Sequence, residues 1–86
     1  MHLFKATLRV QNDVGVLARI TTRLRKFRVN IRSLDVAPID ENERFSDIHM
    51  VIESDRHNID VAMKKTEQLI PVIQVEYQPS IRDPQA

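Results

Sequence analysis

Residues 12–17, with the sequence NDVGVL, are the stretch whose residue types and spacing could do chemistry, and they include the only glycine of the chain. We expect Asp13 to cap a helix and Gly15 to lie in its first turn. The backbone amides of such a turn have no partner inside the helix and lie at the positive end of its dipole. They bind carboxylates, and a residue without a side chain lets a ligand approach the backbone. The stretch is therefore predicted to seat a carboxylate group.

Other reactive side chains do not form catalytic or metal-binding patterns. His2, His49 and His57 lack the spacing of metal ligands, so surface roles are expected for them. Ser33 and Asp35 have no histidine placed to activate them as nucleophiles. The chain contains no cysteine, which excludes disulfides, iron–sulfur clusters and thiol catalysis. We therefore expect a protein that is not an enzyme and holds no metal or cofactor.

Basic residues gather after residue 18, although the net charge of the chain is only +1. They are Arg19, Arg23, Arg25, Lys26, Arg28 and Arg32. A run of this kind is usually the solvated face of a helix. Docking to an acidic surface of a partner protein is a second interpretation, and binding of nucleic acid is a third.

Length and composition limit the architecture that can position these residues. The 86 residues make one small domain, of which 42% are hydrophobic and 29% charged. A chain of this size buries roughly 60–65% of its unfolded surface, so its core is thin. Association with a second copy is a natural remedy. Because no signal peptide or long apolar run appears in the sequence, we expect a cytoplasmic protein that makes no membrane contact.

Hydrophobic periodicity predicts six elements. They are a strand at 2–10, a helix at 14–27, a strand at 30–39, a strand at 45–53, a helix that begins near Ser54-Asp55 or Asn58 and runs through Leu69 and Ile70 until Pro71 stops it, and a strand at 72–77. The polar residues 40–44 form a predicted turn. The residues expected on the buried side of the first helix are Val16, Leu17, Ile20, Leu24 and Phe27.

Right-handed crossovers and short links convert this βαββαβ order into a four-stranded antiparallel sheet with two helices on one face. The fold class is therefore α+β, the ferredoxin-like sandwich. Leu8, Val10, Met50 and Ile52 are expected on its apolar sheet face, and Lys5, Thr7, Arg9, Asp47, His49 and Glu53 on the opposite face. The domain is expected to span residues 1–78, followed by a flexible tail at 79–86.

Two segments resemble the ACT domain, namely residues 12–20 (NDVGVLARI) and residues 30–38 (NIRSLDVAP). More narrowly, the chain is similar to the small regulatory subunit of acetolactate synthase in its short, single-domain form. That family shows Asn-x-x-Gly-x-Leu-x-Arg and then Asn-Ile-x-Ser-Leu-x-Val-Ala-Pro, and the resemblance extends over nearly all of residues 3–78. The chain departs from the family where the first helix ends, because Arg28, followed by Val29, stands where a glycine is usual.

The resemblance implies a homodimer joined through the second strand, with effector pockets at the interface. The residues that it assigns to the effector are Asn12, Gly15, Val16 and Leu17 of one copy and Asn30 and Ile31 of the other. The first group would hold a carboxylate through backbone amides, and the second would reach the amino group and side chain. The implied effector is a small branched-chain amino acid, most simply valine. The implied partner is the catalytic large subunit, a thiamine diphosphate enzyme that carries all the chemistry.

Two other functions fit the order of elements. A free-standing ACT sensor of another amino acid differs from the first interpretation only in its partner. An RNA-binding module shares the βαββαβ order but needs aromatic side chains on its central strands. The strand at 45–53 instead offers Asp47 and Glu53, which would repel phosphate. Contact with nucleic acid is therefore not expected. Asn12 and Asn30 also suit turns and corners for conformational reasons alone.

Overall fold

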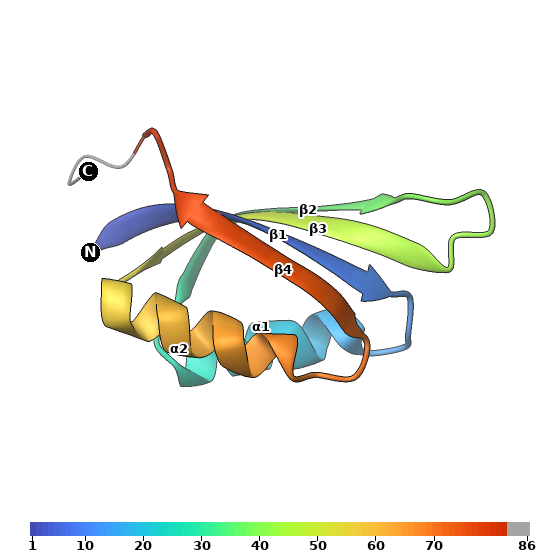
Figure 1. Ribbon diagram of the computed structural model, residues 1–86, viewed down its shortest axis with the longest axis horizontal. Coiled ribbons are helices and arrows are strands. Elements are labelled where there is room, and N and C mark those ends of the chain that lie inside the picture. Colours follow the sequence, from blue (N-terminus) through green and yellow to red (C-terminus); the bar gives the residue numbers. More distant parts are fainter. Residues whose placement is uncertain (83–86) are drawn as a thin grey trace.

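Two layers make up the structure, an antiparallel sheet and a pair of helices that cover one of its faces (Figure 1). The computed structural model describes residues 1–82. Its elements are β1 (His2–Gln11), α1 (Val16–Lys26), β2 (Asn30–Pro38), β3 (Phe45–Ser54), α2 (Arg56–Glu67) and β4 (Val72–Pro79). The four strands are ordered β2-β3-β1-β4, so β2 and β4 are the edges. The predicted α+β ferredoxin-like fold is confirmed.

The core lies between the sheet and the helices because apolar residues alternate along the two central strands and recur with helical spacing on α1 and α2. The sheet contributes Phe4, Ala6, Leu8, Val10, Ile48, Met50 and Ile52, and the helices contribute Val16, Ile20, Leu24, Ile59, Ala62 and Met63. Leu17 was expected on the buried side of α1, but it is 36% exposed. It follows Val16 directly, and consecutive helical residues point about 100° apart.

α1 begins later than predicted, and Asp13 does not cap it. The N-cap residue is Gly15, which adopts the left-handed conformation with φ 81°, and no side chain caps the helix. Asp13 contributes its backbone carbonyl, which accepts a hydrogen bond from the Val16 amide at 3.2 Å. The predictions that Asp13 is the cap and that Gly15 lies inside the first turn are therefore wrong. The chain requires a left-handed residue before the helix, and glycine takes that conformation without steric cost.

The C-terminal end of α1 has Arg28 in the left-handed conformation, with φ 61°. The amide of Arg28 donates to the carbonyl of Arg25, and the amide of Val29 donates to the carbonyl of Leu24, both at 3.0 Å. These bonds satisfy carbonyls that the end of the helix would otherwise leave free. The chain then reverses, so that Val29 is buried. The turn keeps the geometry that glycine favours, at a conformational cost of about 1–2 kcal/mol for a residue with a Cβ.

α2 follows Asp55, one of the predicted caps, and ends at Glu67. The prediction that Leu69 and Ile70 continue this helix is wrong. The chain turns instead, and the Val72 amide donates to the Leu69 carbonyl at 3.0 Å. Leu69 packs against the core from this turn, whereas Ile70 is 91% exposed.

β4 continues to Pro79, two residues beyond its predicted end, and pairs there with Phe4. The amide of Ser80 donates to the carbonyl of Leu3 at 2.9 Å, which extends the contact with β1. The predicted tail at 79–86 thus begins with residues that contact the sheet. Its last part, residues 83–86, lies outside the described residues.

β2 contains a bulge at Arg32. Ile31 and Leu34 lie opposite Ile52 and Met50, which are neighbouring core-facing residues of β3. Regular alternation would place two residues that are three positions apart on opposite faces of a strand. Arg32 is the extra residue that brings both Ile31 and Leu34 to the helix side of the sheet.

Candidate functional site

The side chain of Asn12, directly after β1, is held by the hairpin that joins β2 and β3. Its Oδ1 accepts a hydrogen bond from Ser46 Oγ at 2.7 Å, and its Nδ2 donates to the carbonyl of Glu43. The Asn12 amide donates to the carbonyl of Arg44 at 2.9 Å. Sequence reasoning did not find these partners, because they lie more than thirty residues further along the chain. The network fixes the point from which the loop to α1 departs.

That loop presents unpaired backbone amides. Among residues 1–82, the amides of Gly15, Leu17 and Ala18 donate to no backbone carbonyl, whereas the Val16 amide donates to Asp13. The space beside Gly15 is open, because a Cβ built there would meet nothing within 4 Å. An anion can therefore approach the beginning of α1 from solvent and meet several donors at the positive end of the helix.

The predicted site residues fall into two groups at opposite ends of one protomer. Asn12 is bonded to Ser46 near the beginning of β3, whereas Asn30 pairs with Glu53 near its end. Seven strand positions separate Ser46 from Glu53, a distance of about 23 Å. A single protomer thus does not bring Asn30 and Ile31 to the loop that carries Asn12.

The second group lies at the beginning of the edge strand. Asn30 is exposed, and its Nδ2 donates to Glu53 Oε1 at 3.4 Å. The same carboxylate accepts a hydrogen bond from Arg32 Nη1 at 3.3 Å. Ile31 is half-buried and packs against the core. Of the two predicted site residues, Asn30 and Ile31, Asn30 is therefore the more accessible to a ligand.

The outer side of β2 is uncovered. Leu34 and Val36 lie on the helix side of the sheet, opposite Met50 and Ile48, yet they are 37% and 43% exposed. Leu17 on α1 is also an exposed apolar residue. An edge strand with free hydrogen-bonding groups and apolar side chains is suited to pairing with another strand.

The open face of the sheet is polar at its centre, as predicted. Arg9 contacts Asp47 through two hydrogen bonds, at 2.9 and 3.2 Å. The hydrogen bond and the opposite charge lower the pKa of the Asp47 carboxyl and raise the pKa of Arg9. Thr7 Oγ1 lies 3.3 Å from His49 Nδ1 on the same two strands. This arrangement lacks the central aromatic platform that an RNA-binding sheet of this topology requires.

Three further properties concern the part of the chain that the structure describes. No group of three or more His, Cys, Asp or Glu residues there could hold a metal ion. Every buried polar side-chain atom in the same region has a hydrogen-bond partner, so no unsatisfied polar group marks a hidden site in the core. None of the helices within residues 1–82 has the length and apolar character needed to cross a bilayer.

Comparison with known families identifies the chain. Residues 7–74 match the AHAS small subunit-like ACT domain, a match that extends over most of the sequence. The chain belongs to this ACT domain family. The ACT domain is a regulatory or sensor module, and the resemblance found in the sequence is confirmed. No curated protein matches the sequence of this ACT domain.

Solved structures share the fold of this ACT domain at low sequence identity. A homoserine dehydrogenase from Thiobacillus denitrificans is 24% identical with a TM-score of 0.75, over 91% of this chain and 17% of that chain. An acetolactate synthase small subunit from Thermotoga maritima is 22% identical with a TM-score of 0.74, over 92% of this chain and 47% of that chain. The ACT domain of a GTP pyrophosphokinase from Chlorobium tepidum is 19% identical with a TM-score of 0.72, over 90% of this chain and 97% of that chain. The chain therefore spans less than half of the first two proteins.

Proposed function

We propose that this ACT domain is a non-catalytic regulatory subunit of acetolactate synthase, the enzyme also abbreviated AHAS. It binds a small branched-chain amino acid, most simply valine, and activates or feedback-regulates the catalytic subunit. The observation that carries the proposal is the match of residues 7–74 to the AHAS small subunit-like ACT domain. The chain supplies no cofactor, and the thiamine diphosphate chemistry belongs to the catalytic partner.

A dimer through β2 would complete the effector site. If two β2 edges pair antiparallel across a two-fold axis, the partner strand runs in the opposite direction. Its Asn30 and Ile31 then lie at the end of the sheet that carries Asn12 and Gly15 of the first copy. The uncovered edge and the exposed Leu34 support this arrangement.

Each group of residues has a chemical role in this site. The amides of Gly15 and Leu17 donate to the carboxylate of the amino acid, and the open space beside Gly15 admits it. The partner's Asn30 and Ile31 contact the amino group and the aliphatic side chain. Asn12 keeps the loop in place through its bonds to the β2–β3 hairpin. Effector binding at a subunit interface regulates the enzyme only if the two states of the complex differ in affinity for the effector.

Calorimetric titration with valine, leucine and isoleucine tests the site. We expect saturable binding of valine and roughly tenfold weaker binding by Gly15→Asn, because asparagine accepts the left-handed conformation but fills the open space. The control is Glu43→Asn, at another left-handed position with φ 54°, which should bind valine like the wild type. Equal affinity of Gly15→Asn and wild type would reject the assignment of this loop.

Reconstitution with the catalytic subunit from the same organism tests the partner. We expect the purified chain to bind it and to change its acetolactate synthase activity or its response to valine. Valine binding without any interaction with that subunit would favour a free-standing amino-acid sensor with another partner.

A further inference from the structure

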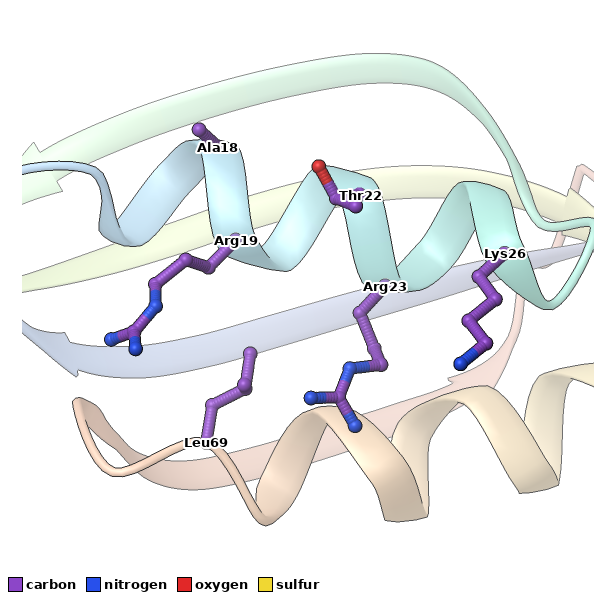
Figure 2. A pocket seen from close by; sticks show the side chains of 6 residues that line it. All are labelled: Ala18, Arg19, Thr22, Arg23, Lys26 and Leu69. Atoms are coloured by element: carbon purple, nitrogen blue, oxygen red, sulfur yellow. The ribbon is translucent and has the colours of Figure 1, made fainter.

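A groove of about 520 Å³ lies on the helix layer, between α1 and the turn that follows α2 (Figure 2). Its lining residues are Ala18, Arg19, Thr22, Arg23, Lys26 and Leu69. Five of them belong to α1, and Leu69 approaches from the other side of the groove. The groove is separate from the β2 edge and includes none of the side chains assigned to the effector.

The charge of this groove is positive and uncompensated. Arg19, Arg23 and Lys26 are spaced four and three positions apart, so they share one face of α1 over about 10 Å. Figure 2 shows the side chains of Arg23 and Lys26 extending from α1 toward α2, and that of Arg19 extending toward the turn that follows α2. Arg23 Nη1 donates to the carbonyl of Lys65 at 3.4 Å, so its guanidinium reaches across the groove. None of the three forms an ion pair with a carboxylate within residues 1–82.

Exposed apolar residues occur in the two loops next to the groove, although only Leu69 lines it. Leu69 is half-buried in it, and the neighbouring Ile70 is 91% exposed. Val14 is fully exposed in the loop before α1. The two loops are adjacent, because the Gln11 amide donates to the carbonyl of Pro71 at 2.8 Å. Exposed apolar side chains beside a cationic stripe are typical of a protein-binding surface.

We propose that this groove docks an acidic, amphipathic segment of a partner protein, with carboxylates on Arg19, Arg23 and Lys26 and an apolar side chain against Leu69 and Ile70. The partner is the catalytic subunit, and this part rests on the function proposed above. Three cations spread over about 10 Å suit a chain of carboxylates better than a single phosphate group. No aromatic side chain lines the groove to stack a base, which disfavours single-stranded nucleic acid.

Charge reversal with a matched control tests the surface. Arg19→Glu/Lys26→Glu reverses two groove cations, and Arg25→Glu/Lys64→Glu makes the same net change at exposed residues that do not line the groove. We expect the first variant to bind the catalytic subunit at least roughly tenfold more weakly, and the control to bind within about twofold of wild type. Valine binding should be unchanged in both. Equal losses in the two variants would overturn the groove as the docking surface while leaving the proposed function intact.

A second experiment tests whether the groove binds an acidic, amphipathic segment in the absence of the catalytic subunit. A short synthetic helical peptide with glutamates on one side and leucines on the other is titrated into the isotopically labelled chain and followed by amide NMR. We expect saturable shifts at Ala18, Thr22 and Leu69 that are absent in Arg19→Glu/Lys26→Glu. Shifts spread over all basic residues, or none at these amides, would overturn the proposal. If wild type fails to bind the catalytic subunit but the peptide binds here, the proposed function fails and the acidic-segment site stands.

Discussion

Ser46 Oγ donates a 2.7 Å hydrogen bond to Asn12 Oδ1 and thereby joins the end of β1 to the beginning of β3. Ser46 is almost fully buried, whereas the Asn12 side chain continues outward to the carbonyl of Glu43. The bond places the loop between β1 and α1 relative to the sheet. It gives Asn12 a structural role that does not depend on ligand contact.

Removal of this bond should lower stability. We expect Ser46→Ala to reduce the free energy of unfolding by about 1 kcal/mol, because Asn12 Oδ1 loses its donor. Asn12→Asp should lose a similar amount for a different reason, since its carboxylate cannot donate to the Glu43 carbonyl. Urea denaturation followed by circular dichroism measures both changes. Wild-type midpoints in both variants would show that the network adds nothing to stability.

Arg28→Gly should stabilise the fold. Arginine is held at φ 61°, where glycine avoids a steric cost, so we expect a gain of about 1 kcal/mol in the free energy of unfolding. The control is Arg25→Gly inside α1, which should lose about 1 kcal/mol through its lower helix propensity. Thermal denaturation distinguishes the two. A lower melting temperature for Arg28→Gly would mean that the arginine side chain contributes more than its backbone conformation costs.

Leu34→Lys should disrupt association. Leu34 is a 37% exposed apolar residue on the free edge strand, and a lysine there would place a charge in an interface between two β2 strands. We expect monomers or aggregates in light scattering, with a dimer dissociation constant at least roughly tenfold higher. Ile73→Lys on the other edge strand, where the residue is 50% exposed, should leave the dimer intact. A dimer lost with Ile73→Lys and kept with Leu34→Lys would assign the interface to β4.

Asp47 makes stability depend on pH in the acidic range. Its pKa is lowered in the folded state by Arg9, so the contact stabilises fully above the ordinary aspartate pKa of about 3.9 and is lost as the pH falls through that value toward the folded pKa. We expect Asp47→Asn to be less stable than wild type at neutral pH and the difference to narrow in acid. Asp35→Asn serves as the control, since Asp35 is exposed and forms no ion pair among the described residues. A difference that stays constant down to acid pH would exclude the charge on Asp47 as its cause.

Residue periodicity was sufficient to predict the sheet and its two faces, because alternation along residues 2–10 and 45–53 records directly which side chains are buried. It failed where the backbone conformation of one residue decides the structure. Asp13 has the residue type of a helix cap, yet Gly15 takes that place, in a left-handed conformation that glycine adopts without steric cost. Leu69 and Ile70 continue an apolar pattern, but the chain must already turn toward β4.

The site was predictable only in part, for a related reason. The first-turn amides near Gly15 follow from the position of a helix start along the chain. The bonds of Asn12 to the hairpin and the convergence of Arg19, Arg23 and Leu69 depend on distant segments that one sequence does not pair. The resemblance to the ACT family supplied the specific assignment, and the match to residues 7–74 confirms the family.

The bulge at Arg32 lets β2 vary in length by one residue without changing which side chains are buried. Deletion of this residue would leave a regular strand in which Ile31 and Leu34 are two positions apart, so both would still lie on the helix side. Leu34 and Val36 would keep their places toward the helices, and Ser33 and Asp35 would stay on the polar side. A homologue with a regular second strand should therefore align with this chain through a one-residue gap at position 32, with the same alternation on either side of it.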